Sequence, residues 1–236
     1  TETEETKIEA QILFEENGGK EVEDLKGFAG EVIEETLPST EKQGYDFAGW
    51  YSDEALTNEV TSLPEKYPAG TTIYYAKWTP RDDTKYVVNH YLENLDKTEN
   101  EYTLKLSEDK QGTTGELTQA TVKEYTGFTA PETVEQKTIL ADGTTVVDIF
   151  YTRNSYTITY KVVGDYFQND KYAQETYKYE EVVTAIATPS EVGYDFNGWS
   201  GVPETMPAED VEATGYYTTR DDTKYVVNHY LENLDK

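Results

Sequence analysis

Several residue types are absent from this chain or rare in it, and each scarcity removes a class of chemistry. Its 236 residues include no cysteine and only two histidines. Without cysteine there are no disulfides, thiolate zinc sites or cysteine nucleophiles. No long apolar run is present, which excludes a transmembrane helix. The start, Thr-Glu-Thr-Glu-Glu, lacks the basic flank and apolar stretch of a secretory signal. We therefore expect an internal piece or a trimmed form of a longer protein.

Positive charge is also scarce. The chain has 20 Lys and Arg against 47 Asp and Glu, a formal net charge of -27. Nucleic acids and anionic lipid surfaces bind basic faces, so neither is expected as a partner, and no membrane insertion is expected. Disordered acidic segments contain few aromatic residues, whereas this chain has 21 tyrosines. Because tyrosine favours strands, the composition predicts a folded, β-rich protein.

The sequence repeats itself at two levels. The stretch RDDTKYVVNHYLENLDK, residues 81–97, recurs unchanged as residues 220–236. A shorter motif, Gly44–Trp50, recurs as Gly193–Trp199 with one difference. Repetition of this kind indicates a tandem array of small modules. We expect modules at 1–80, 81–153 and 154–219, with 220–236 as the truncated first strand of a further repeat.

Each module opens with a pattern typical of a hairpin. In the first, Ile8–Phe14 is followed by Asn17-Gly18-Gly19, which supplies the positive φ angles of a tight turn. The corresponding pairs are Tyr86–Leu92 with Tyr102–Leu106, and Tyr156–Val163 with Tyr172–Tyr179. Weak helical patterning at 30–37, 115–123 and 182–187 allows a turn or two of helix. The expected fold class is therefore α+β and β-rich, with small mixed sheets and a short helix.

The linkers between the modules, 79–84 and 152–155, contain no Gly/Ser run and read as stiff or semi-stiff joints. Three modules of this size, each with a radius of gyration of about 11 Å, would form an elongated string on the order of 100 Å long.

The spaced motifs of the first module carry a family resemblance. Asn17–Gly19, Gly44–Trp50, Tyr67–Gly70 and Tyr75–Trp78 together resemble the Listeria–Bacteroides repeat, also called the internalin-type B repeat, over nearly the whole module. The third module, with Gly193–Trp199 followed by residues 200–211, resembles a shorter variant of that repeat.

The middle module is similar to mucin-binding-protein-type repeats, through Tyr86–Tyr91 at its start and Val147–Tyr151 at its end. These resemblances imply a β-grasp-like (ubiquitin-like) fold. They also imply tandem arrays on wall-anchored surface proteins of Gram-positive bacteria, and hence an extracellular, cell-surface location.

No catalytic, cofactor-binding or metal-binding residue is assigned, and the protein is not expected to be an enzyme. His90 and His229 occupy the same repeat position, without a serine or cysteine partner pattern, and are interpreted as structural. Asp82-Asp83 and Asp221-Asp222 lie at joints, but they lack the alternating pattern of a calcium loop and are interpreted as solvated charge.

The three tryptophans offer either a platform for a sugar ring or parts of small cores. Trp50 and Trp199 share one motif position, which favours the core, as expected where small domains depend on a few large side chains. For Trp78, which lies outside that motif, the core is also favoured, because small domains depend on a few large side chains.

The leading hypothesis is a structural one: a stalk or spacer segment of a repetitive, adhesin-like surface protein, whose partners are the neighbouring repeats of the same chain. The alternative is an adhesion module that binds a host mucin, another glycan or a protein through residues 81–153. A third hypothesis is strand-mediated self-association through 220–236. For this third hypothesis, residues 224–231 are expected to form a strand that either continues the last module or adds to the sheet edge of a neighbour.

Overall fold

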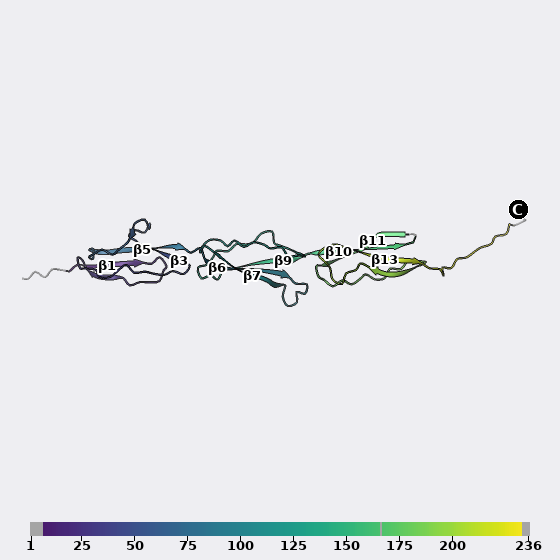
Figure 1. Cartoon of the computed structure of the whole chain (residues 1–236), viewed down its shortest axis with the longest axis horizontal. Helices are drawn as coiled ribbons and strands as arrows, with labels where there is room; N and C mark the ends of the chain where they lie inside the picture. Colours follow the sequence, from purple (N-terminus) through teal and green to yellow (C-terminus); the bar gives the residue numbers. More distant parts are fainter. Residues whose placement is uncertain (1–6, 166, 233–236) are drawn as a thin grey trace, which may run out of the picture. The chain divides into compact units, whose positions relative to one another are not determined.

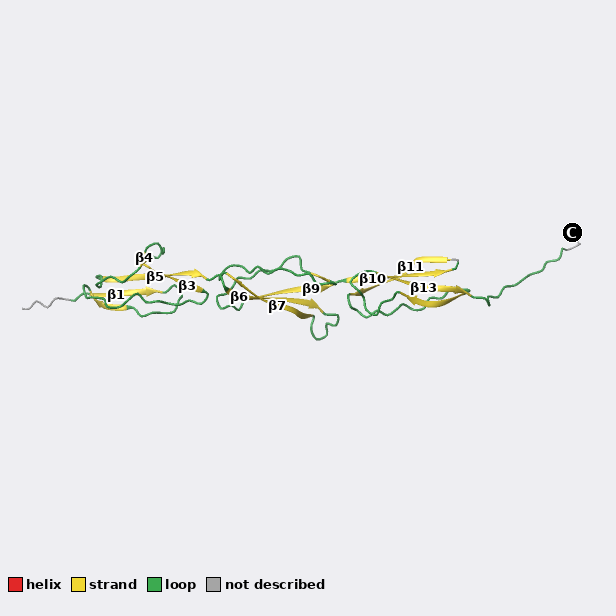
Figure 2. Cartoon of the chain, viewed as in Figure 1, coloured by secondary structure: helices red, strands yellow, loops and turns green. Residues whose placement is uncertain are grey.

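The computed structural model describes residues 7–165 and 167–232, and within these ranges every regular element is a β-strand (Figure 1, Figure 2). The strands form three sheets, built from residues 9–80, 84–153 and 155–219. Each sheet thus takes its strands from one of the three modules that the sequence indicates. No helix of the described residues has the length and apolar character needed to cross a membrane.

The first sheet has five strands in the order β2-β1-β5-β3-β4. These are β1 (Glu9–Glu15), β2 (Leu25–Phe28), β3 (Tyr45–Tyr51), β4 (Glu59–Val60) and β5 (Gly70–Pro80). β1 pairs in parallel with β5, and the other pairs are antiparallel. Ala10, Ile12 and Phe14 alternate along β1 and are buried in one cluster with Trp50. This alternation is that of a strand with one face on a core.

The hairpin expected at the start of the first module is confirmed. Asn17 and Gly18 have φ angles of 51° and 81°, and the Gly19 N–H donates to the Glu16 carbonyl at 3.0 Å. The chain then returns as β2, antiparallel to β1.

The third sheet repeats the first without β4, in the order β11-β10-β13-β12. Its strands are β10 (Ser155–Gly164), β11 (Phe167–Lys178), β12 (Tyr194–Ser200) and β13 (Val211–Thr219). Both sheets have an irregularity in register just before the motif tryptophan, where Gly49 and Gly198 have φ angles of 106° and 101°. The repeated motif therefore encodes a β-bulge that only glycine adopts without strain.

The motif tryptophans pack in cores, as the sequence predicts. Trp50 is 2% exposed and Trp199 is half-buried against the core of the third sheet. Their indole N–H groups donate to the carbonyls of Pro38, at 2.7 Å, and Ile186, at 3.2 Å. A buried tryptophan needs such a partner, so the motif position is satisfied without a ligand.

The middle sheet has the order β7-β6-β9-β8. Its strands are β6 (Thr84–Glu93), β7 (Tyr102–Gly112), β8 (Phe128–Thr129) and β9 (Val146–Arg153). The chain divides into two compact units, whose boundary falls between His90 and Tyr91 in β6 and between Ile149 and Phe150 in β9. Each of the joints described below lies within one unit.

The expected α+β class, and with it the β-grasp-like fold, is wrong. The three segments expected to be helical, 30–37, 115–123 and 182–187, form no helix, and every regular element of the described residues is a β-strand. Each contains an isolated antiparallel bridge to a distant segment: Val32 with Lys66, Leu117 with Thr138, and Val182 with Thr205. Beside the first bridge, the Ile33 N–H donates to Glu65 and the Tyr67 N–H to Glu31. Backbone groups committed to another segment cannot form the i to i−4 bonds of a helix.

The expectation for the chain's last residues is also wrong where the structure describes them. Residues 223–232 form no strand, and Tyr225 and Leu231 are 85% and 95% exposed. Residues 233–236 of this expectation lie outside the described residues. A strand requires neighbours that pair with it, and the segment meets none here.

Candidate functional site at the module joints

Charged side chains converge where the chain passes from one sheet to the next. We define the first joint by Gly44, Asp46, Arg81, Asp83, Thr114 and Ala141. The second joint consists of Glu93, Gly127, Phe128, Arg153, Lys178, Tyr179 and Glu180.

Arg81 organises the first joint through two carboxylates. Its Nε and Nη2 donate to the two oxygens of Asp83, at 2.9 and 2.6 Å, and its Nη1 lies 3.2 Å from Asp46 Oδ1. The hydrogen bond and charge of Arg81 lower the pKa of Asp83. All three side chains are exposed, so the ion pairs contribute little stability. Their two-pronged geometry nevertheless orients the linker.

Gly44 is where the first joint is tightest. Its φ angle is 75°, and a Cβ placed on it would lie 2.8 Å from both Ala141 Cα and Thr114 Oγ1. The Arg81 N–H donates to the Gly44 carbonyl at 3.0 Å, and the Thr114 N–H donates to the Arg81 carbonyl at 2.9 Å. The backbone of the first module therefore touches two loops of the second, and glycine is required there.

The ionic half of the first joint recurs after the third sheet. Arg220 holds both oxygens of Asp222, at 2.9 and 2.7 Å, and contacts Asp195 Oδ1 at 3.1 Å. Its N–H donates to the Gly193 carbonyl at 2.9 Å. The two repeats thus build the same clamp to within a tenth of an ångström.

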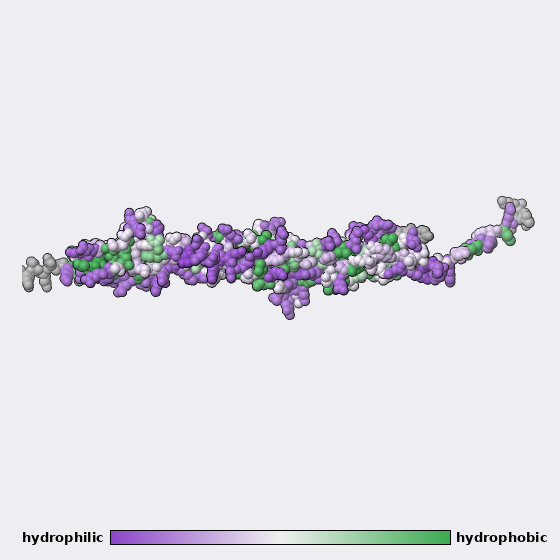
Figure 3. Space-filling model, viewed as in Figure 1, coloured by the Kyte–Doolittle hydropathy of each residue, from purple (hydrophilic) through white to green (hydrophobic). Residues whose placement is uncertain are grey.

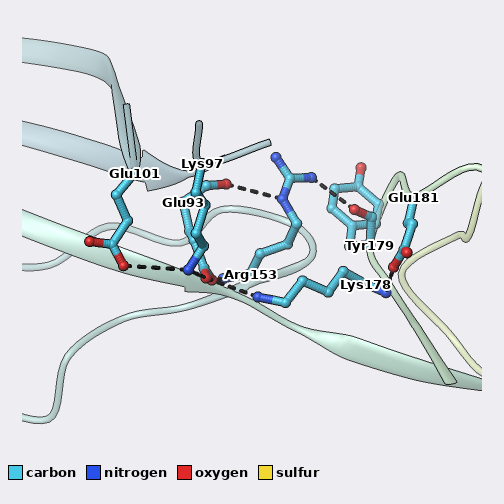
Figure 4. A network of polar contacts seen from close by, with 7 residues as sticks. All are labelled: Glu93, Lys97, Glu101, Arg153, Lys178, Tyr179 and Glu181. Atoms are coloured by element: carbon cyan, nitrogen blue, oxygen red, sulfur yellow. Dashed lines mark hydrogen bonds and ion pairs between the residues drawn. The ribbon is translucent and has the colours of Figure 1, made fainter. Parts of the chain in front are cut away.

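The second joint is centred on Arg153, the last residue of β9 (Figure 4). Its Nη1 donates to the Tyr179 carbonyl at 2.8 Å and to Glu180 Oε2 at 2.7 Å, and its Nε donates to the Glu93 carbonyl at 3.0 Å. The guanidinium lies 4.7 Å from the ring centre of Phe128, and only 10% of the side chain is exposed. A buried, planar, multiply bonded cation is the type of contact that arginine makes and lysine does not.

Glu93 is the counter-charge of this joint and is 4% exposed. Its Oε1 receives Lys97 Nζ at 2.6 Å and Lys178 Nζ at 2.9 Å, and its Oε2 receives the Arg153 N–H at 2.7 Å. Burial acts to raise the pKa of Glu93, but these hydrogen bonds outweigh it and lower the pKa to about 2. The carboxylate is therefore charged at any physiological pH.

Because Gly127 has no side chain, the ring of Tyr179 can pack directly against its backbone in the second joint. A Cβ on Gly127 would lie 2.1 Å from that ring, and its φ angle is 78°. The Asn154 N–H donates to the Gly127 carbonyl, and the Tyr179 N–H donates to the Asn154 carbonyl, both at 2.9 Å. A short backbone ladder thus continues from the middle module into the third.

The residues singled out from the sequence lie apart from one another. His90 is fully buried, with its Nε2 3.0 Å from Glu108 Oε2, as a structural histidine would be. Both carboxylate oxygens of Asp83 bind Arg81. Within residues 7–165 and 167–232, no three His, Cys, Asp or Glu side chains cluster as metal ligands would.

The sequence reasoning missed the second joint. The linker 152–155 indicated a short joint, and Arg153 is its only charged residue, so a signal was present. Glu93, which contacts Arg153, and Lys178, which contacts Glu93, both lie far from Arg153 in the sequence. Their convergence depends on how β6, β9 and β11 end in space.

Comparison with known families identifies the repeats. The model of the Listeria-Bacteroides repeat domain matches residues 11–77 and 156–224, which together are more than half of the chain. The chain therefore belongs to this repeat family, with one repeat in the first sheet and one in the third.

Two proteins of Evansella cellulosilytica are similar to this chain. One, provisionally named a membrane protein, is 28% identical over 200 residues, which are 80% of this chain and 28% of that protein. The other, provisionally named a Gly-rich membrane protein, is 25% identical over 196 residues, 80% of this chain and 21% of that protein. The chain thus spans about a quarter of the length of these relatives.

Proposed function

We propose that this chain is a spacer segment of a surface-associated repeat protein, in which built joints hold successive modules in sequence and project a distal domain from the cell. The observation that carries the proposal is the clamp of Arg81, repeated with the same geometry at Arg220. The ionic half of the first joint is thus built twice with the same geometry, as expected where the spacing of modules matters.

The second joint supports the same proposal. A flexible tether would leave its linker in solvent, whereas Arg153 is buried between the modules and bonded to Glu93 and Glu180. The excess of Asp and Glu over Lys and Arg also favours an extended arrangement of the modules, because like charges on successive modules repel each other.

The cell surface is the proposed location, with anchoring to the wall in a longer protein. The support is the family of the two repeats and the provisional names of the two relatives, both of which are membrane proteins by name.

Small-angle scattering of the whole chain tests the spacer. We expect a maximum dimension on the order of 100 Å, and a broader distance distribution for the variant Arg153→Ala, which opens the second joint. Arg220→Ala, which removes the terminal clamp beyond the last sheet, is the matched control and should leave the distribution unchanged. A compact particle for the unmodified chain would contradict the proposal.

A second candidate function is adhesion through the middle module, to a mucin glycan or another host ligand. The favouring observation is an aromatic cluster: Tyr91 and Phe150 stack with ring centres 5.1 Å apart and planes 18° apart, and Tyr102 meets Phe150 edge-on at 4.9 Å. Phe150 is 45% exposed. Flat aromatic faces of this kind suit the apolar face of a sugar.

A glycan array probed with the whole chain tests adhesion. Saturable binding that Phe150→Ala abolishes and Tyr230→Ala preserves would favour adhesion over the spacer. Tyr230 is the copy of Tyr91 in the repeated stretch and is 89% exposed. Binding that survives Phe150→Ala would remove the aromatic cluster from consideration.

A further inference from the structure

The chain contains two Asn-Gly pairs, Asn17-Gly18 and Asn197-Gly198. In such a pair the backbone nitrogen of the glycine can attack the side-chain amide of the asparagine. Glycine favours this reaction because it has no Cβ to obstruct the approach and its backbone is the least restricted. The two pairs are the same in sequence, but their surroundings in the fold differ.

The first pair is held firmly in the turn after β1. Asn17 Nδ2 donates to the Ala76 carbonyl at 2.8 Å, and Lys42 Nζ donates to the Asn17 carbonyl, also at 2.8 Å. A Cβ on Gly18 would lie 3.5 Å from Lys42 Nζ, so this lysine covers the glycine. The amide of Asn17 and the adjacent backbone are therefore fixed, and any reaction there must first break these hydrogen bonds.

The second pair forms the β-bulge of β12. The two residues between Phe196 and Trp199 face Tyr216 alone on β13. In a bulge the extra residue stands outside the ladder of backbone hydrogen bonds. Asn197 is exposed, and its Nδ2 donates to Thr218 Oγ1 at 3.4 Å, which is longer than the about 2.7–3.2 Å of a normal N–H···O bond. The side-chain amide of this asparagine is thus held only weakly.

The flank of this bulge is open because β12 is an edge strand. In the first sheet β4 lies beside the corresponding strand, β3, and a Cβ on Gly49 would be 3.5 Å from Glu59 Oε1. By contrast, no described atom would lie within 4 Å of a Cβ on Gly198. Most of the visible surface of the third sheet is hydrophilic or of intermediate hydropathy (Figure 3), as expected of a surface in contact with water.

We propose that Asn197 is a modification site, at which the third module undergoes deamidation. The Gly198 nitrogen loses its proton and bonds to Asn197 Cγ, the side-chain nitrogen leaves as ammonia, and a succinimide ring forms. Water then opens the ring at either of its carbonyls and gives aspartate or isoaspartate. The net reaction consumes a water molecule and releases ammonia, without an oxidant or a reductant. This inference goes beyond the spacer function and does not depend on it.

The isoaspartate product alters the third module because it adds a methylene group to the main chain. The addition falls in β12 just before Trp199, whose indole N–H donates to the Ile186 carbonyl at 3.2 Å. We therefore expect the backbone amides of β12 to exchange with solvent faster in the isoaspartate form. The first module has Ala48 at the corresponding position and forms the same bulge, so the bulge itself does not require asparagine.

Storage of the whole chain at neutral pH, followed by peptide mass spectrometry, tests the proposal. Deamidation replaces an NH2 group by OH and raises the peptide mass, and fragmentation across the Cα–Cβ bond distinguishes isoaspartate from aspartate. We expect Asn197 to react at least about fivefold faster than Asn17 in the folded chain, since Asn17 must first break a hydrogen bond. In concentrated urea, where both pairs are unfolded, the two rates should converge. Equal rates in the folded chain would overturn the proposal.

Asn197→Ala is the matched variant, because it gives the third module the residue that the first module has at this position. It should abolish the mass increase in the peptide that contains β12, and hydrogen exchange in β12 should then stay constant during storage. If exchange in β12 increases during storage in this variant as it does in the unmodified chain, the change does not arise at Asn197 and the proposal is wrong.

Discussion

Glu93, at the end of β6, accepts a hydrogen bond of 2.9 Å from Lys178, at the end of β11, and thereby ties the middle sheet to the third. The same carboxylate receives Lys97 and the Arg153 N–H. The hydrogen bonds from Lys97, Lys178 and Arg153 together outweigh the effect of burial and lower the pKa of Glu93 from 4.5 to about 2. In the folded chain, Glu93 therefore stays ionised down to a lower pH than it does in the unfolded chain.

This pKa predicts how the stability of the second joint depends on pH. Because the pKa of Glu93 is lower in the folded chain, its contribution, about 3 kcal/mol, is present above pH 4.5 and is lost as the pH falls towards 2. Urea unfolding read by hydrogen exchange of β9 and β11 should show that Glu93→Gln costs about this much at pH 7 and progressively less below pH 5.

The chain supplies its own control for that experiment. Glu232 is the copy of Glu93 in the repeated stretch 220–236 and is exposed, so Glu232→Gln should change stability by less than about 0.5 kcal/mol at every pH. Parallel pH curves for Glu93→Gln and the unmodified chain would show that Glu93 does not carry the effect.

We expect that even the conservative substitution Arg153→Lys destabilises the second joint. Arg153→Lys keeps the charge but loses the planar fork that reaches Glu93, Tyr179 and Glu180, and it should cost about 2–4 kcal/mol. Arg220→Lys, in an exposed clamp, should cost far less. Chemical denaturation combined with limited proteolysis of the linker 152–155 measures both, and equal costs would refute the central role of Arg153.

Gly44 and Gly193 are the first residues of the repeated motif, and their carbonyls accept the N–H groups of Arg81 and Arg220. Substituting each of them distinguishes the cost of backbone strain from the cost of a packing collision. Gly44→Ala and Gly193→Ala both place a side chain at positive φ, which should cost about 1 kcal/mol each. Gly44→Ala adds a collision with Ala141 and should cost a further 1–3 kcal/mol or so. Thermal unfolding gives the comparison, and the first joint is looser than described if the two variants melt together.

Val88 and Val227 occupy the same position of the repeated stretch, but Val88 is buried and Val227 is exposed. Val88 is 1% exposed in β6, and Val88→Ala should cost about 2 kcal/mol. Val227→Ala, at the copy of Val88, should be neutral to within about 0.5 kcal/mol, because Val227 is 60% exposed. A comparable loss of stability for Val227→Ala, measured by chemical denaturation, would mean that residues 223–232 are packed in solution.

The local features of the fold follow from short stretches of sequence. Asn17-Gly18-Gly19 specified its turn because only a few residue types accept positive φ, and Gly49 and Gly198 specified bulges for the same reason. The helices expected at 30–37, 115–123 and 182–187 failed because weak local patterning was overridden by bridges to segments far along the chain.

By itself, the sequence determined the repeats, the turn at Asn17–Gly19 and the core position of the motif tryptophans Trp50 and Trp199. Tertiary structure alone decided which charges meet, because Arg153, Glu93 and Lys178 converge only once three strands have ended at one place. It also decided whether YVVNHY becomes a strand. Residues 86–91 form part of a strand, whereas the identical residues 225–230 are coil. The reason is that neighbouring strands, and not the sequence of the strand itself, supply its backbone hydrogen bonds and cover its apolar side chains.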